Sequence, residues 1–396
     1  MVDISGASPL RTVATSDLFQ ILRDGTPRTR AELAAITGLA RSTVALRVDA
    51  LMRLGLVSPT ADAASTGGRP SSQFALDARG KVVLGVDIGA SHIHLAVSDL
   101  TGRILAEDST PMAVSSGPDA VLDWVAIAGA ALVDGAVRSP SDLLAVGVGL
   151  PGPVEHSTGR PINPPIMPGW DRFDVPAALT SRFGVPVLVD NDVNIMALGE
   201  RELAWPDVEH LIFVKVATGI GAGVISGGFL QRGAQGIAGD IGHVQISRGR
   251  DVLCRCGNHG CLEALASGRA LAQALRDTGL DADGAQAVID LVKRGNLEAI
   301  QAVRQAGRDL GEVLTTCVSL MNPSVIVIGG SMAQAGEHLI AGVREVIYTR
   351  STPLATQHLH ITHSSVGPQA AVVGAAMLAI HFALSPERVD AMVTAG

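Results

Sequence analysis

Aromatic residues are scarce in this sequence, at 3% of 396 positions, so small aliphatic side chains must fill its cores. No apolar run reaches the roughly 18 residues of a membrane span, which argues against a membrane protein. The amino terminus has no charged segment followed by an apolar stretch, so a secretion signal is not expected. Without secretion, the 4 cysteines should stay reduced rather than form a disulfide framework. These absences predict a cytoplasmic protein.

An excess of positive charge is also lacking. The net charge of −8 argues against a protein that coats nucleic acid, but the charge is unevenly distributed. Residues 1–76 carry eight arginines against six acids, or +2, which leaves −10 for the remainder. At 396 residues the chain exceeds a single core, so two or three domains are expected. The basic part is confined to the amino-terminal segment.

That segment has the pattern of a helix-turn-helix. Apolar residues within 16–22 fit one helical face, and Thr29 with Glu32 forms a capping box that opens a second helix. A turn around Gly38 precedes a third helix over residues 41–54, whose valines and leucines point inward. Four polar residues of the third helix then face outward as candidate DNA contacts: Arg41, Ser42, Thr43 and Arg47.

Two strands over residues 55–58 and 73–76 would flank a glycine-rich tip at 65–70, which makes a winged version of the motif. Arg69 follows two glycines and precedes a proline, an arrangement suited to insertion into a narrow minor groove. The alternative interpretation is a three-helix packing module with a solvated loop.

Three of the cysteines fall within eight residues, which is hard to assign to core packing. The thiolates of Cys254, Cys256 and Cys261 with the imidazole of His243 make a tetrahedral ligand set suited to zinc. Glycines at 257 and 260 allow the loop to wrap an ion. The alternative is three buried or reducible thiols without a metal.

Gly-His followed by Cys-x-Cys-Gly-x-x-Gly-Cys-x-Glu resembles the zinc segment of the ROK family, which contains sugar kinases and sugar-responsive transcriptional repressors. The resemblance extends over essentially the whole chain. It implies a structural zinc within residues 243–261, and the Thr-Gly-Gly-Arg-Pro tip resembles the wing of ROK repressors, a segment that kinase-only members usually lack. It divides the chain into a winged helix-turn-helix domain at 1–78 and a sugar-kinase-like effector domain at 79–396.

The effector domain should be an α/β, two-lobed fold of the actin-like or ribonuclease H-like type. A buried strand from residue 82 runs into Asp-x-Gly and a hairpin, as in the first phosphate loop of sugar kinases, and residues 211–226 partly repeat it. A third strand at 325–328 ends in two glycines that should begin a helix. The repetition predicts an internal duplication. Residues matching phosphate contacts for ATP are Asp87, Gly89, Thr218, Gly219, Gly221 and Gly329.

A strand at 185–189 leads to Asp190-Asn191-Asp192, followed by a helix over 195–204. By itself this tripeptide is most often a turn. It resembles the Asn-Asp motif of ROK kinases, in which Asn holds the sugar and Asp is the catalytic base, so these roles pass to Asn191 and Asp192. The family's other sugar contacts map to Asp240, His243 and Glu263.

Four departures set this chain apart from the family's kinases. The first loop ends in His92 where a lysine is usual, Ala217 replaces a glycine, Ile166 replaces a sugar-binding asparagine, and Asp240 replaces a glutamate. A displacement of about 1 Å costs a positioned reaction on the order of 10²-fold, whereas binding tolerates it better. Sugar binding is therefore expected to survive better than ATP turnover.

Three functions remain. The first is a sugar-responsive DNA-binding transcriptional regulator, most simply a repressor, with operator DNA and a monosaccharide or sugar phosphate as partners. The second is an ATP- and Mg²⁺-dependent sugar kinase with Asp192 as base, and the third is a purely structural zinc protein. A homodimer or a higher homo-oligomer is expected, because operators are commonly two-fold symmetric.

Overall fold

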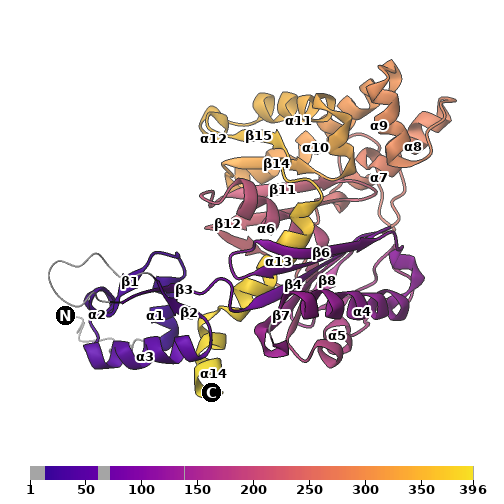
Figure 1. The fold of residues 1–396 in the computed structure, drawn as a ribbon. Helices are drawn as coiled ribbons and strands as arrows, with labels where there is room; N and C mark the ends of the chain where they lie inside the picture. The colour runs from indigo at the N-terminus through magenta and orange to yellow at the C-terminus, as the bar shows by residue number, and fades with distance from the viewer. Residues whose placement is uncertain (1–13, 61–71, 138, 396) are drawn as a thin grey trace, which may run out of the picture.

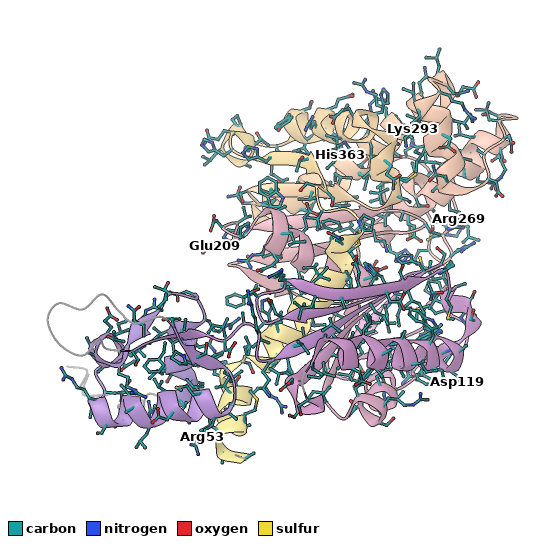
Figure 2. The ribbon with its side chains drawn as sticks, in the orientation of Figure 1. Arg53, Asp119, Glu209, Arg269, Lys293 and His363 are labelled. Atoms are coloured by element: carbon teal, nitrogen blue, oxygen red, sulfur yellow. The ribbon has the colours of Figure 1, made fainter. Side chains whose placement is uncertain are left out.

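The computed structural model describes residues 14–60, 72–137 and 139–395. A small domain of helices with a short sheet lies beside a two-lobed body, and one C-terminal helix runs from between the lobes toward the small domain (Figure 1). Figure 2 shows the described side chains, with Arg53 on the small domain, Asp119 on the first lobe and Lys293 on the second. The predicted α/β fold class, with its amino-terminal helix-turn-helix region, is confirmed.

The small domain packs three helices against a three-stranded antiparallel sheet in the order β1-β3-β2. Its elements are α1 (Thr15–Leu22), β1 (Arg28–Thr29), α2 (Arg30–Thr37), α3 (Arg41–Arg53), β2 (Val57–Pro59) and β3 (Gln73–Leu76). The predicted capping box opens α2, because the Thr29 side chain accepts from the Glu32 amide and Glu32 accepts from the Thr29 amide. Gly38, at φ +69°, ends α2 in the left-handed conformation. Arg69 and the predicted wing tip lie outside the described residues.

Each lobe of the body contains a five-stranded sheet. The first has the order β10-β7-β4-β5-β6 and the second the order β13-β12-β11-β14-β15. In both, three consecutive strands form an antiparallel meander and two later strands add in parallel beside the meander's first strand. The second sheet thus repeats the topology of the first, as an internal duplication requires.

The strands of the first lobe are β4 (Val82–Ile88), β5 (Ile93–Asp99), β6 (Ile104–Thr110), β7 (Leu143–Leu150) and β10 (Val187–Asn191), with α4 (Pro118–Ala136) and α5 (Val175–Phe183) beside them. Those of the second lobe are β11 (Leu211–Val216), β12 (Ile220–Ser226), β13 (Phe229–Gln231), β14 (Val325–Gly329) and β15 (His360–His363). Helices α7 (Leu262–Ala266), α8 (Gly268–Asp277), α9 (Gly284–Lys293), α10 (Leu297–Met321), α11 (Glu337–Arg350) and α12 (Pro353–Thr356) complete the second lobe. β8 (Val154–Glu155) and β9 (Arg160–Pro161) form a separate two-stranded ladder.

Two helices with small residues cross between the lobes. They are α6 (Asp192–Ala204) and α13 (Gln369–Ala383), and α13 also packs on β4 and β7. A Cβ atom on Gly374 of α13 would lie 1.6 Å from the carbonyl oxygen of Ile195 in α6, and one on Gly199 would lie 1.9 Å from the carbonyl oxygen of Ala370. The two backbones therefore touch, and only glycine fits at these positions.

The C-terminal helix α14 (Pro386–Ala395) returns to the small domain and packs on α1. Ser16 donates from both its amide and its hydroxyl to the Asp390 carboxylate, at 3.0 and 2.7 Å. The apolar core of the small domain continues without a break into α13 and α14. Among the described residues, no single helix is long and apolar enough to cross a membrane, and α13 with α14 meets that test only as a pair bent by 58°.

Two sequence-based boundaries were wrong. The predicted helix directly after Gly329 is a 3₁₀ turn over Ser331–Ala335, and α11 begins only at Glu337. The Asp190–Asp192 tripeptide is not a free turn, since β10 runs to Asn191 and α6 begins at Asp192. The helix starts earlier than expected because the Asn191 side chain accepts from the Val193 amide as an N-cap.

Candidate functional site

The four predicted metal ligands converge in the second lobe. One ligand atom from each of His243, Cys254, Cys256 and Cys261 lies within 4.8 Å of all the others. The Sγ atoms of Cys256 and Cys261 are 3.7 Å apart, as are Cys254 Sγ and His243 Nδ1. Ligands about 2.3 Å from zinc at tetrahedral angles are separated by about 3.8 Å, so this set fits a structural zinc.

The chemistry of these thiols also favours a bound cation. Burial raises the pKa of Cys261 to about 12, and a hydrogen bond from the Asn258 amide lowers the pKa of Cys256. Without a metal, adjacent thiols resist losing their protons together because the resulting thiolate charges repel, whereas a bound zinc ion replaces those protons.

The zinc segment, residues 243–261, contacts the rest of the second lobe on two sides. Arg248 pairs with Asp309 of α10, whose side chain is 3% exposed, and Ser247 bonds to Glu312 one turn later. On the other side Cys261 is the N-cap residue of the short helix α7, which carries Glu263. Glu263 Oε2 accepts a hydrogen bond from the Ile220 amide at 3.0 Å, where β12 begins. A metal at Cys261 therefore positions Glu263 against the glycine-rich turn 218–221.

The predicted sugar-binding residues differ in whether structural hydrogen bonds already occupy their side chains. His243 turns Nδ1 toward Cys254, which leaves Nε2 as the nitrogen away from the metal set, and Asp240 is exposed just before it. Asn191, by contrast, already has structural partners, because it caps α6 and donates from Nδ2 to the Gly152 carbonyl at 2.7 Å. These roles remain predictions.

Asp192, the predicted base, is buried and paired with a lysine that the sequence reading did not select. Lys215 Nζ of β11 lies 2.5 Å from Asp192 Oδ2. Burial lowers the pKa of Lys215, but the charge and hydrogen bond of Asp192, with a contribution from Asp87, outweigh that effect and raise it. Lys215 therefore holds one carboxylate oxygen, Oδ2, of the predicted base.

A second ion pair lies beside the first. His92 Nε2 is 3.2 Å from Asp87 Oδ2, and this hydrogen bond raises the pKa of His92. The charges of Lys215 and Asp192 also act on His92, so the structure brings two carboxylates, a lysine and a histidine together where the two lobes meet. We call Asp87, His92, Asp192 and Lys215 the interlobe ion cluster.

Several glycines predicted to contact phosphate have structural roles in hydrogen bonding or close packing. The Gly89 amide donates to the His92 carbonyl at 2.8 Å, and a Cβ at Gly89 would lie 2.2 Å from the His92 ring. Gly329 makes room for the Phe213 ring, which is 2.3 Å from where its Cβ would be, and a Cβ on Gly219 would meet the Glu263 carboxylate. Their use by ATP remains a prediction.

The third helix of the small domain exposes a somewhat different set of residues from the one predicted. Arg41 and Ser42 are exposed, Thr43 is half-buried, and Arg47 turns back to donate to the Ala14 carbonyl at 3.2 Å. Leu46, which the sequence reading passed over, is 72% exposed. Helical periodicity alone could have predicted this exposure. Leu46 lies two residues from each of the inward positions 44 and 48, which places it on the opposite face of the helix.

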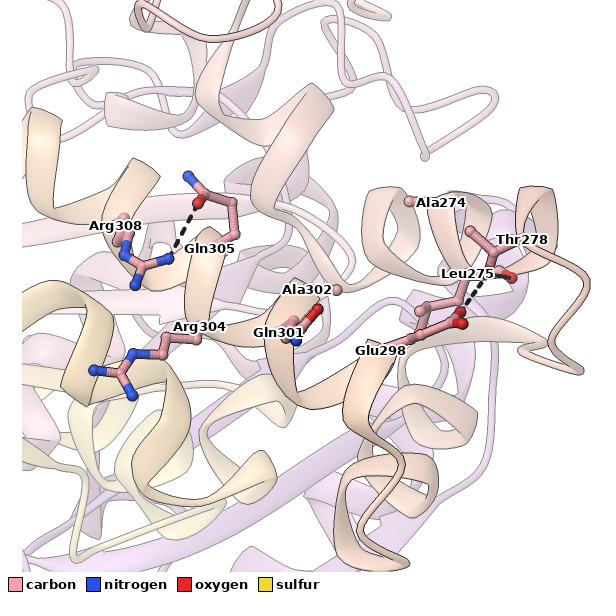
Figure 3. A pocket seen from close by; sticks show the side chains of 9 residues that line it. All are labelled: Ala274, Leu275, Thr278, Glu298, Gln301, Ala302, Arg304, Gln305 and Arg308. Atoms are coloured by element: carbon pink, nitrogen blue, oxygen red, sulfur yellow. Dashed lines mark hydrogen bonds between the residues drawn. The ribbon is translucent and has the colours of Figure 1, made fainter.

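A surface groove on the second lobe does not belong to this chemistry. It encloses about 710 Å³ between α8 and α10 and is lined by residues such as Thr278, Glu298 and Arg304 (Figure 3). None of the predicted sugar, phosphate or metal residues lines it.

Comparison with known proteins decides the family. The ROK family model matches residues 83–381. The chain belongs to the ROK family. Its two sheets, its glycine-rich turns and its cluster of one histidine and three cysteines are thus the features of a ROK body, with an additional amino-terminal region.

The ROK relatives include both regulators and kinases. The xylose repressor of Caldicellulosiruptor bescii is 29% identical over 370 residues, which cover 90% of this chain and 92% of the repressor. The ROK hexokinase structure from Thermus thermophilus is 32% identical, with a TM-score of 0.64, and covers 75% of this chain and 97% of the hexokinase. The crystal structure of a ROK family transcriptional regulator, a homologue of the E. coli MLC protein, has a TM-score of 0.82 at 24% identity and covers 96% of this chain and 98% of its own, which shows the shared fold.

Proposed function

We propose that this ROK protein is a carbohydrate-responsive, DNA-binding transcriptional regulator, with residues 1–78 as the DNA-binding domain and 79–396 as the effector domain. The observation that carries the proposal is a helix-turn-helix region joined to a ROK body in one chain. The xylose repressor spans the same combination, whereas the hexokinase leaves a quarter of this chain uncovered. A kinase has no need of the additional domain.

The DNA contact is assigned to the exposed face of α3. Arg41, at the start of the helix, offers a guanidinium to a phosphate or a guanine, and Ser42 offers a hydroxyl. Leu46 would contact a thymine methyl group, which is the apolar feature of the major groove. Arg69 of the wing would enter the minor groove. Arg47 is better placed to hold the segment before α1 than to contact DNA.

The effector domain is proposed to bind a sugar beside Asn191, Asp192, Asp240, His243 and Glu263, with zinc holding the last two in place. The link to DNA runs through α13 and α14. Helix α13 packs on the first sheet and on α6, which packs on the second sheet, and α14 is bonded to α1 through Asp390 and Ser16. A sugar that favours one arrangement of the lobes would therefore also favour one position of the small domain.

Selection of DNA from a random pool tests the DNA-binding half. We expect enrichment of a symmetric sequence by a dimer. Arg41→Ala should lower the salt dependence of binding by about one counterion. Leu46→Ala should leave the salt dependence unchanged while relaxing the choice at one base pair, at a cost of about 1–3 kcal/mol. A protein that enriches no sequence contradicts the proposal.

A sugar kinase is the second candidate, favoured by Asp192 at the start of α6 and by the likeness to the hexokinase. In that reaction Asp192 would accept the proton of a sugar hydroxyl while ATP and Mg²⁺ supply the phosphoryl group. The Lys215 pair opposes this role. ADP release with any aldose that disappears in Asp192→Asn would support the kinase, and no release with a panel of aldoses would exclude it for those sugars.

A further inference from the structure

The interlobe ion cluster has a consistent orientation. In both ion pairs the acid is the buried partner, because the side chains of Asp87 and Asp192 are 8% and 10% exposed. The cations reach outward, with His92 at 55% and Lys215 at 26% exposure. A solute that approaches this place therefore meets two cations before it meets the carboxylates.

The cations also have donors to spare. An ammonium group has three N–H donors, and Asp192 takes one from Lys215. Asp192 is the first residue of α6, a 13-residue helix whose amino-terminal dipole adds positive potential at the same point. Each pair is neutral overall, so an anion is favoured only on the outward side, where the basic side chains and the helix dipole lie nearer to it than the buried carboxylates do.

Building on the proposed sugar-sensing function, we propose that Lys215 and His92 bind the phosphate group of a phosphorylated sugar. In a sugar kinase the base contacts the hydroxyl that receives the phosphoryl group. A phosphate already attached to that hydroxyl occupies the space beside Asp192, which is where the Lys215 ammonium lies. Lys215 thus turns a site for phosphorylating a sugar into one that recognises the product of a sugar phosphorylation carried out elsewhere.

A nucleotide phosphate has the same chemistry, but the surroundings favour the sugar as its carrier. The Gly89 amide, which a nucleotide phosphate would need, is bonded to the His92 carbonyl, and the His92 ring covers that glycine. The Lys215 ammonium is instead bonded to Asp192, one of the residues assigned to the sugar, and His92 lies within electrostatic reach of both.

Titration of the full-length protein with inorganic phosphate, followed by ³¹P NMR, tests the assignment without knowledge of the sugar. Lys215→Met should weaken phosphate binding about tenfold or more, because a charge-assisted hydrogen bond is lost. The matched control is Lys81→Met, since Lys81 is also paired with an aspartate, Asp142 at 3.0 Å, but lies outside the cluster. His92→Gln, a change at an exposed side chain, covers the case in which Lys215→Met fails to fold. Wild-type phosphate affinity in either folded variant overturns the proposal.

Competition then distinguishes the two carriers of phosphate. Hexose and pentose monophosphates should displace bound inorganic phosphate at lower concentration than ATP does. Stronger displacement by ATP, or displacement by neither, contradicts a sugar phosphate at this site. DNA binding is measured separately, so a protein that binds sugar phosphates but selects no DNA would keep this site and lose the regulatory function.

Discussion

Replacing Gly374 with alanine should separate the two helices on which the lobes meet. The new Cβ would lie 1.6 Å from the Ile195 carbonyl oxygen and 2.5 Å from its carbon. Ordinary contact distances are about 3.5 Å, so α13 must move by roughly 1.5–2 Å, and backbone atoms cannot rotate out of the way. The cost should be about 3 kcal/mol or more, the upper end for an overpacked core. At about 1.5 °C per kcal/mol for a body of this size, Tm should fall by at least about 4 °C.

The matched control is Gly135→Ala. Gly135 is also helical, in α4, but it is exposed and a Cβ there meets nothing within 4 Å. Alanine should raise stability by up to about 1 kcal/mol at that position, because it restricts the unfolded chain and favours helix. Thermal unfolding of both variants is the assay. If Gly374→Ala were as stable as Gly135→Ala, the close contact of α6 and α13 would be refuted.

The remaining predictions concern zinc, pH and the small domain. Cys256→Ser should lose the bound metal by elemental analysis and weaken sugar binding about 10–100-fold, whereas Cys317→Ser, on α10 outside the cluster, should change neither. The pKa of His92 is raised above its ordinary 6.5 by Asp87, with Lys215 lowering it and Asp192 raising it, so its protonated form is complete at lower pH and lost as pH rises through the raised value. As pH rises through that range, the affinity of the wild type for phosphate should fall more than the affinity of His92→Gln does. An equal pH dependence of the two affinities would contradict this. Thr29→Ala removes the α2 cap and should cost about 1 kcal/mol in chemical unfolding of the small domain, while equal stability of wild type and variant would count against the capping box.

Local features were predictable from the sequence because their parts are close along the chain. The capping box of α2 spans four residues, and the three cysteines of the metal set lie in one loop. An internal duplication was predicted from glycine-rich turns after buried strands, and the structure adds that the two sheets repeat one strand order. Here a short stretch of sequence determines the local geometry.

Long-range pairs were not predictable. Lys215 and Asp192 are 23 residues apart, and Arg232 reaches back 42 residues to the buried Asp190. The bond between Ser16 and Asp390 spans 374 residues and makes the C-terminal helix a partner of the small domain. Lys215 interrupts an apolar strand, which indicates that it needs a partner but does not identify that partner. The packing of β11 against the start of α6 in the folded chain brings Lys215 to Asp192.

The dependence of DNA affinity on carbohydrate is the most direct test of the proposed regulator. Fluorescence anisotropy with the selected DNA should be recorded for the metal-loaded protein with sugars and sugar phosphates, at fixed salt. A coupling of about 1–3 kcal/mol predicts a change in DNA affinity of about 5–150-fold with at least one of them. The change should vanish in Lys215→Met when the effector is a phosphate. DNA binding that no carbohydrate alters, in protein shown to bind that carbohydrate, would contradict a sugar-responsive regulator.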